Sequence, residues 1–164
     1  DDLKGLRIRI QPSETMVRLM QMFGAEGVEL AWGNVFIALK SKLVDGAENS
    51  VAALIVGNHA DVVSHYSFDE HTMVPDVLLI GASRLQSLTP TQREIVREAA
   101  LSSYHYMNTL WSDFEVRSRA EIERRGVTFV WPDKAPFIEK AAALTGIFAG
   151  DASSQALLQR IAKS

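Results

Sequence analysis

A run of 35 residues without glycine or proline, at 91–125, constrains the fold of this chain more than any other feature. Thr89-Pro90 precedes the run and Gly126 follows it, which are typical signals for the start and the end of a helix. Its apolar residues do not form a sustained heptad, so a coiled coil is not favoured. A helix of this length would extend about 52 Å, which is longer than one small domain is wide. We therefore expect a helix that spans two lobes.

The first 66 residues alternate between strand and helix signals. Residues 6–11 alternate apolar and polar with a period of two, which predicts a strand with one buried face. Ser13 and Gly24 then bracket an apolar stripe with helical spacing. A second strand is expected at 28–32 and a second helix from Gly33 onward. This order is typical of a parallel α/β layer.

The rest of the chain carries weaker signals. Residues 44–49 read as a turn that leads into a short strand, and 51–63 as a buried helix in which Gly57 is unfavourable. Within an extended stretch at 65–82, the apolar residues 77–80 predict a buried core strand. A further strand is expected at 127–130, followed by two helical stretches within 132–164.

Composition and motifs exclude several functions. The net charge is −3, so no overall positive field would attract nucleic acid. Cysteine is absent, and the four histidines lack metal-binding spacing, so neither a metal nor a cofactor is expected. Asp45 and Glu48 could form an acid–base pair, but a turn-stabilising pair is the commoner arrangement, and no nucleophile motif is present. We do not expect an enzyme.

Arg7 and Arg9 are the strongest candidates for a functional role. The alternation places both side chains on one face of the first strand, where they are either two solvent-facing charges or include one that binds a carboxylate in a cleft. Arginine suits carboxylates because its planar guanidinium donates two parallel charge-assisted hydrogen bonds. Gln11 and Asn49 could add neutral hydrogen bonds, and Trp32 could supply an apolar or stacking wall.

Three segments carry a family resemblance: Asp-Leu-Lys-Gly-Leu-Arg-Ile-Arg at 2–9, Ala-Trp-Gly-Asn-Val-Phe-Ile-Ala-Leu at 31–39 and Val-Asp-Gly-Ala-Glu-Asn at 44–49. In this order and spacing they resemble the solute-binding proteins of TRAP transporters, of the DctP type. Glu-His-Thr-Met at 70–73 and Leu-Thr-Pro at 88–90 agree with that family. The signatures are most similar to those of the subfamily that binds uronates and related sugar acids.

The resemblance implies an α/β fold of the bilobed, periplasmic-binding-protein-like kind. This chain would supply the second lobe, part of the first lobe and the lobe-spanning helix. Residues 1–66 would then be a second-lobe segment, 67–90 a crossover with a first-lobe strand, 91–126 the long helix, and 127–164 a second-lobe strand with the C-terminal helices. Family members are about twice this length, so we expect an N-terminal segment of the same protein to be missing. Its absence would expose apolar surface and favour a homodimer or a domain swap.

The resemblance also implies a function, namely periplasmic capture of an organic acid anion such as a uronate and its delivery to a TRAP membrane permease. Arg9 matches the family's arginine that forms a salt bridge with the ligand carboxylate, Asn49 matches a further ligand contact, and Trp32 matches a pocket wall. Contacts with sugar hydroxyls are expected from Gln11, Asn34, His71 and Asp76. Two alternatives stay open: a ligand of the C4-dicarboxylate class, and a truncated interaction or dimerisation module that binds no small ligand.

Overall fold

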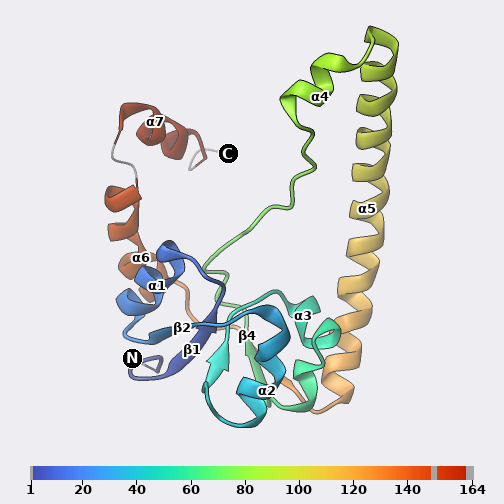
Figure 1. The fold of residues 1–164 in the computed structure, drawn as a ribbon. Helices are drawn as coiled ribbons and strands as arrows, with labels where there is room; N and C mark the ends of the chain where they lie inside the picture. Colours follow the sequence, from blue (N-terminus) through green and yellow to red (C-terminus); the bar gives the residue numbers. More distant parts are fainter. Residues whose placement is uncertain (1, 149–150, 162–164) are drawn as a thin grey trace.

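The computed structural model describes residues 2–148 and 151–161 (Figure 1). Its strands are β1 (Arg7–Ile10), β2 (Glu26–Glu29), β3 (Gly46–Ala47), β4 (His65–Ser67) and β5 (Thr128–Val130). Its helices are α1 (Glu14–Phe23), α2 (Val35–Lys40), α3 (Val51–Val56), α4 (Ala82–Ser87), α5 (Pro90–Arg124), α6 (Ala135–Phe148) and α7 (Ala152–Ile161), with short 3₁₀ helices η1 (Trp32–Asn34) and η2 (His59–Asp61). We call residues 2–72 and 118–144 the lobe, and residues 73–117 the arm, which rises from the lobe in Figure 1.

Two parallel sheets organise the lobe. One has the order β2-β1-β3, in which Arg9 pairs with Val28 on one side and with Ala47 on the other. The second sheet pairs β4 with β5. Because parallel strands end at the same edge of a sheet, the residues that follow β1, β2 and β3 come together there. The expected parallel α/β layer is therefore confirmed.

Helix α1 forms as the sequence predicts. The Ser13 hydroxyl accepts a hydrogen bond from the Met16 backbone N–H at 3.4 Å, and Gly24 ends the helix in the left-handed conformation with φ of +85°. The buried face of α1 packs on the apolar face of β1, and α6 closes the same cluster from outside. Its buried members are Ile8, Ile10, Leu19, Met20, Phe23 and Ala25.

Two smaller clusters complete the lobe. One joins α3 and β5 to the C-terminal end of α5 through Val51, Leu54, Ala60, Ile122 and Val127. The other comprises Val35, Ala38, Leu39 and Val44, and packs against Val28 and Leu30. Since Val28 is the sheet partner of Arg9, the face of β1 that carries Arg9 is the face that α2 covers.

Helix α5 confirms the long helix predicted between Thr89 and Gly126. The Thr89 hydroxyl accepts from the Gln92 N–H, while the Gln92 side chain accepts from the Thr89 N–H, so the first turn has a complete capping box. Gly126 follows the helix with φ of +86°. Of the 35 residues of α5, all of which the structure describes, only Ser118 and Ile122 are buried.

The predicted core strand at 77–80 is wrong. Residues Val77, Leu78 and Leu79 are 68–82% exposed, and Ile80 is 43% exposed. They form part of an extended crossover that climbs from the lobe to α4 (Figure 1). An apolar run becomes a core strand only where a neighbour covers it, and none of the described strands pairs with this segment.

Other boundaries differ in smaller ways. The second strand is Glu26–Glu29 rather than 28–32, because the chain turns into η1 after Leu30. The helix predicted at 51–63 is split: α3 ends at Val56, and Asn58 at φ of +56° leads into η2. The strand at 127–130, the turn into β3 and the two C-terminal helices are confirmed, apart from 149–150 and 162–164, which lie outside the described residues. None of the described helices has the length and apolar character needed to cross a membrane.

Candidate functional site

Arg7 and Arg9 differ in burial although they share a face of β1. The Arg7 guanidinium is partly exposed and binds the Asp45 carboxylate through Nη2 at 2.8 Å and Nε at 3.0 Å. These hydrogen bonds lower the pKa of Asp45 to about 2. Arg9 is only 2% exposed. The interpretation as two solvent-facing charges therefore fails for Arg9, because α2 and the chain after β2 cover it.

The Arg9 guanidinium is a buried cation with one free nitrogen. Its Nε and Nη2 donate to the Leu30 carbonyl oxygen at 2.9 and 2.8 Å. Its Nη1 is buried and has no hydrogen-bond partner among the described residues. Burial lowers the pKa of Arg9 and the Glu48 carboxylate opposes that effect, but an arginine stays charged at any ordinary pH. A buried, charged donor without an acceptor is costly unless an anion binds it.

Three further ionisable side chains form a group in which Glu48 acts electrostatically on Arg9. His71 Nδ1 donates to the Asp69 carboxylate at 2.8 Å, and His71 Nε2 lies 4.0 Å from Glu48 Oε2. Burial disfavours the charged form of His71, but the hydrogen bond to Asp69 and the charges of Asp69 and Glu48 outweigh it, so its pKa is raised. Glu48 is a candidate site residue, whereas the sequence predicts only a turn-stabilising role for it. Its position directly after β3, beside Arg9 in the same sheet, is the sequence signal that could have identified Glu48 as a site residue.

Asn49 follows Glu48 and is held on two sides. Its side-chain oxygen accepts from the Ser50 N–H at 2.8 Å, and its carbonyl oxygen accepts from the Tyr66 hydroxyl at 2.9 Å. Burial, with the nearby Asp69 carboxylate, raises the pKa of Tyr66 to about 12, so the phenol remains a donor. Within the described chain the Asn49 amide NH₂ donates to no group. It is therefore available to a ligand.

Trp32 and His59 form the aromatic side of the site. Trp32 is 42% exposed in η1, and its ring centroid lies 5.0 Å from that of His59, which is buried. Burial and the charge of Arg9 both lower the pKa of His59. Sequence reasoning grouped His59 with surface or core histidines and assigned it no role. The residue has no motif around it, and only the fold brings it close to Arg9 and Trp32.

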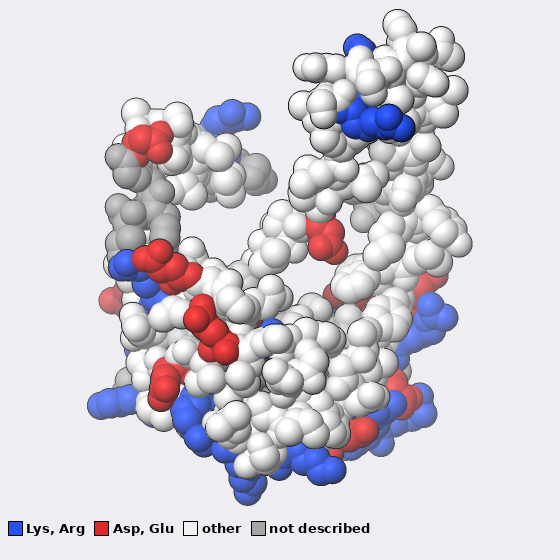
Figure 2. Space-filling view, in the orientation of Figure 1, with Lys and Arg blue, Asp and Glu red and all other residues white. Residues whose placement is uncertain are grey.

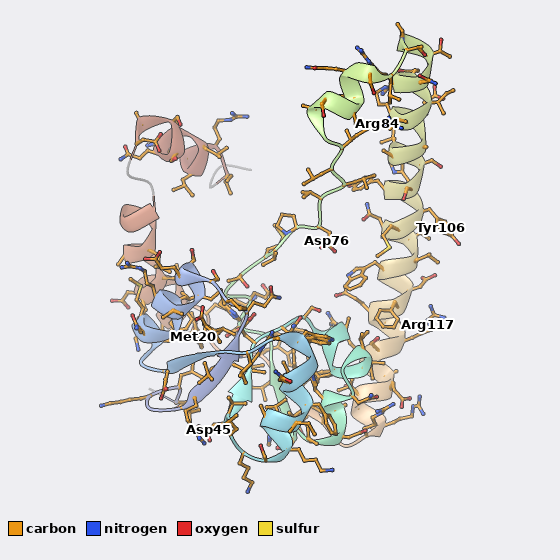
Figure 3. All side chains as sticks on the ribbon, viewed as in Figure 1. Met20, Asp45, Asp76, Arg84, Tyr106 and Arg117 are labelled. Carbon is orange, nitrogen blue, oxygen red and sulfur yellow. The ribbon has the colours of Figure 1, made fainter. Side chains whose placement is uncertain are left out.

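Of the other residues predicted to contact a ligand, Gln11 and Asn34 lie in the lobe and Asp76 lies in the arm. Gln11 is exposed directly after β1, and Asn34 is exposed in η1 next to Trp32. Asp76 lies on the ascending crossover of the arm, well away from the lobe (Figure 3). The structure thus places Arg9, Asn49 and His71 around Glu48 and Tyr66, with Trp32 beside them. It does not bring Asp76 to this group.

Two hollows lie on different sides of α5. One, of about 590 Å³, is lined by α5 residues together with Phe129 and Trp131. The other, of about 560 Å³, lies against Ile55. Arg9 lines neither of these hollows. No group of three acidic or histidine side chains in the described part of the chain is placed to hold a metal ion.

Fold and site together define a class. The structure combines a parallel α/β lobe with a strand edge that carries a buried cation with a free N–H, an exposed indole and an available amide. Figure 2 shows Lys and Arg side chains gathered along the lower edge of the lobe, whereas Arg9 is buried. The sequence matches the bacterial extracellular solute-binding protein, family 7 (DctP), over residues 1–151, and the chain belongs to this family.

Relatives agree with this assignment. The chain is 34% identical over 140 residues to the uncharacterized protein YiiZ of Salmonella typhimurium, an alignment that covers 85% of this chain and 43% of that protein. It is similar to a TRAP periplasmic solute-binding protein of Xanthobacter autotrophicus solved with β-D-galacturonate, with a TM-score of 0.92 and 39% identity over 98% of this chain and 54% of that one. A TRAP periplasmic solute-binding protein of Chromohalobacter salexigens with bound D-glucuronate gives a TM-score of 0.93 at 27% identity, with the same coverage of both chains.

These matches confirm the predicted family and fold class. The chain spans about half the length of the relatives it matches. Its mixed strands and helices correspond to part of the bilobed α/β fold of TRAP solute-binding proteins.

Proposed function

We propose that this chain supplies the carboxylate-binding lobe of a TRAP solute-binding protein whose ligand is a sugar-acid anion of the uronate class. The observation that carries the proposal is the buried Nη1 of Arg9, which has no acceptor among the described residues. A ligand carboxylate would satisfy this nitrogen and neutralise a cation that burial otherwise disfavours. The two uronate-bound structures named above support the choice of ligand class.

The other side chains suit a sugar acid. The free amide of Asn49 can donate to a carboxylate or ring oxygen, and the exposed indole of Trp32 can cover the apolar face of a pyranose ring. Hydroxyl groups would be bound by polar side chains at the same edge, namely Gln11, Asn34 and His71. Asp76 would contact the ligand only if the arm moved toward the lobe.

The proposed biological role is capture and delivery without chemical change of the ligand. We place the protein in the periplasm, as the names of the solved relatives state for those proteins, and propose a TRAP membrane permease as the acceptor of the anion. The C4-dicarboxylate alternative uses the same Arg9 contact but has no use for the indole. A preference for uronates or for C4-dicarboxylates therefore distinguishes the two hypotheses about the ligand.

Calorimetry on the full-length gene product tests this function with D-glucuronate, D-galacturonate, succinate and L-malate. Arg9→Lys keeps the charge and removes the planar fork, and we expect it to weaken uronate binding about 30-fold or more, a cost of about 2 kcal/mol. Arg7→Lys is the matched control from the same strand and should leave the affinity within about twofold. Equal effects of the two substitutions would refute the proposal, and tighter binding of succinate or malate would favour the dicarboxylate class.

One observation favours a second candidate, an interaction module. The apolar residues at 77–80 are exposed and not covered by any described part of the chain. A patch of this kind favours association with a protein surface. Light scattering on the 164-residue chain distinguishes the candidates. A stable dimer that Leu79→Asp dissociates, with no thermal shift on addition of uronates, supports the module.

A further inference from the structure

We infer that His59 is a positioning residue: it fixes the indole of Trp32 as the wall of the binding site and thereby makes the site prefer ring-shaped sugar acids over open-chain acids. The inference rests on the proposed function. It depends on two contacts of the imidazole, with Trp32 and with Gly57, and on a backbone link between Trp32 and Arg9.

The first contact is with Trp32. This residue opens η1, a single turn whose three residues are all exposed, so the indole has little support from its own element. Its ring lies 5.0 Å from the His59 ring at an interplanar angle of 53°. His59 is only 4% exposed and cannot move freely. The buried imidazole therefore acts as the support of the exposed indole.

The second contact is with Gly57. A Cβ atom at this position would come within 2.5 Å of His59 Nε2, 2.8 Å of Cε1 and 2.9 Å of Cδ2. The backbone of Gly57 has φ of −93°, which any residue can adopt, so space rather than conformation requires the glycine. Asn58, left-handed with φ of +56°, turns the chain so that the imidazole returns over Gly57. The ring is thus held between Gly57 and Trp32.

The third relation is with Arg9. The Leu30 carbonyl that accepts two hydrogen bonds from the guanidinium belongs to the residue two positions before Trp32. Burial, and to a smaller extent the charge of Arg9, lower the pKa of His59. Trp32 is therefore connected to Arg9 through the backbone of Leu30 and packs on His59 on its other side.

This arrangement separates two parts of ligand recognition. Arg9 binds the carboxylate, which every candidate acid possesses. The indole that His59 supports binds a flat apolar ring face, which an open-chain acid does not present. Loss of the support should therefore weaken the binding of ring acids selectively, whereas a general loss of stability would weaken all acids alike.

Calorimetry on the full-length gene product tests the inference with D-glucuronate and an open-chain sugar acid, D-gluconate. We expect the natural protein to prefer glucuronate at least tenfold. His59→Ala and Gly57→Ala should each reduce that preference about tenfold, whereas His59→Phe, which keeps an aromatic support, should stay within about threefold of the natural protein. His105→Ala, at an exposed histidine of α5, is the control and should change nothing.

A measurement without ligand complements this test. In a Trp111→Phe, Trp131→Phe variant of the 164-residue chain, Trp32 is the only indole. Acrylamide should quench its emission more strongly after His59→Ala or Gly57→Ala, but not after His59→Phe. Equal losses for both acids, or quenching that none of these substitutions changes, would overturn the positioning role. If the natural protein binds glucuronate and His59→Ala leaves the preference intact, the inference alone fails. If the natural protein binds no uronate, the proposed function fails with it.

Discussion

The lobe and the arm use the same long helix in opposite ways. At the lobe end of α5, Ile122 is fully buried in a cluster with α3 and β5. Along the arm the apolar residues Ile95, Leu101 and Tyr106 are at least half exposed, and Figure 3 shows Tyr106 on the projecting part of the helix. One continuous helix is thus stabilised by core packing at one end, whereas at the other end it is stabilised by contacts between residues close in sequence.

Capping, an ion pair and hydrogen bonds to α4 stabilise the arm end of α5. The arm has the Thr89 capping box and an ion pair between Arg97 and Glu94. Arg93 also joins α5 to α4, since its Nε donates to the Leu85 carbonyl at 3.0 Å and its Nη2 to that of Gln86 at 2.9 Å. Such contacts are individually weak and do not depend on a core. The contrast teaches that helix formation and helix burial are separate properties of this sequence.

The largest expected effect tests burial directly. Ile122→Ala should lower the free energy of unfolding of the 164-residue chain by about 2–5 kcal/mol, because it leaves a cavity in the lobe. Leu101→Ala, the matched change in the arm, should stay within about 0.5 kcal/mol. Urea denaturation followed by circular dichroism measures both. A similar cost at the two positions in the full-length gene product would mean that another part of the protein covers the arm.

A smaller effect is expected from the cap of the arm. Thr89→Ala removes the side-chain acceptor for the Gln92 N–H and should destabilise the first turns of α5 by about 1 kcal/mol. Because these turns have no core beneath them, amide hydrogen exchange should accelerate there and not near Ile122. Faster exchange throughout the lobe would show that the two regions unfold together.

A still smaller effect depends on pH and belongs to the lobe alone. The pKa of His71 is raised in the folded protein, so its protonated form contributes stability that is complete below the unfolded value of about 6.5. That contribution is lost as the pH rises through the folded pKa. Urea midpoints at pH 6 and pH 9 should therefore differ less in His71→Gln than in the natural protein. His105→Gln in the arm is the control, and an equal change there would contradict the assignment.

The smallest effect concerns the exposed ion pair of the arm. Arg97→Gln removes the partner of Glu94, and we expect no measurable change in the free energy of unfolding because water and salt screen both side chains. The same urea titration at low and at high salt is the measurement. A clear loss of stability that salt abolishes would show that the arm depends on electrostatics more than its exposure indicates.

Local signals made much of this fold predictable. The bounds of α5 follow from Thr89, Pro90 and Gly126, and those of α1 from Ser13 and Gly24, because caps and helix breakers act within a few residues. The apolar and polar alternation around β1 predicted the strand and its buried apolar face, but not that Arg9 on the opposite face is buried as well. The family signatures predicted Arg9, Asn49 and Trp32 as site residues, and the fold places them near one another.

What could not be predicted depends on distant partners. Periodicity made Arg7 and Arg9 equivalent, yet only contact with Asp45 or with Leu30 decides which guanidinium is exposed. The apolar run at 77–80 indicates a segment suited to burial, but the sequence does not show which neighbour would cover it, and in the structure the segment is exposed. Gly57 was read as a weakness of a helix, whereas its lack of a side chain leaves room for His59.

The fixed end of α5 also has a mechanical consequence. Among the described residues, α5 is packed into a core only near Ile122. A rod of about 52 Å fixed at that end acts as a lever, so a rotation of about 5° there displaces its far tip by roughly 4–5 Å. A change of side-chain packing too small to alter any strand pairing would thus be amplified into a movement larger than a water molecule. Leverage of this kind requires stiffness, which gives a physical reason for the absence of glycine and proline along the whole span.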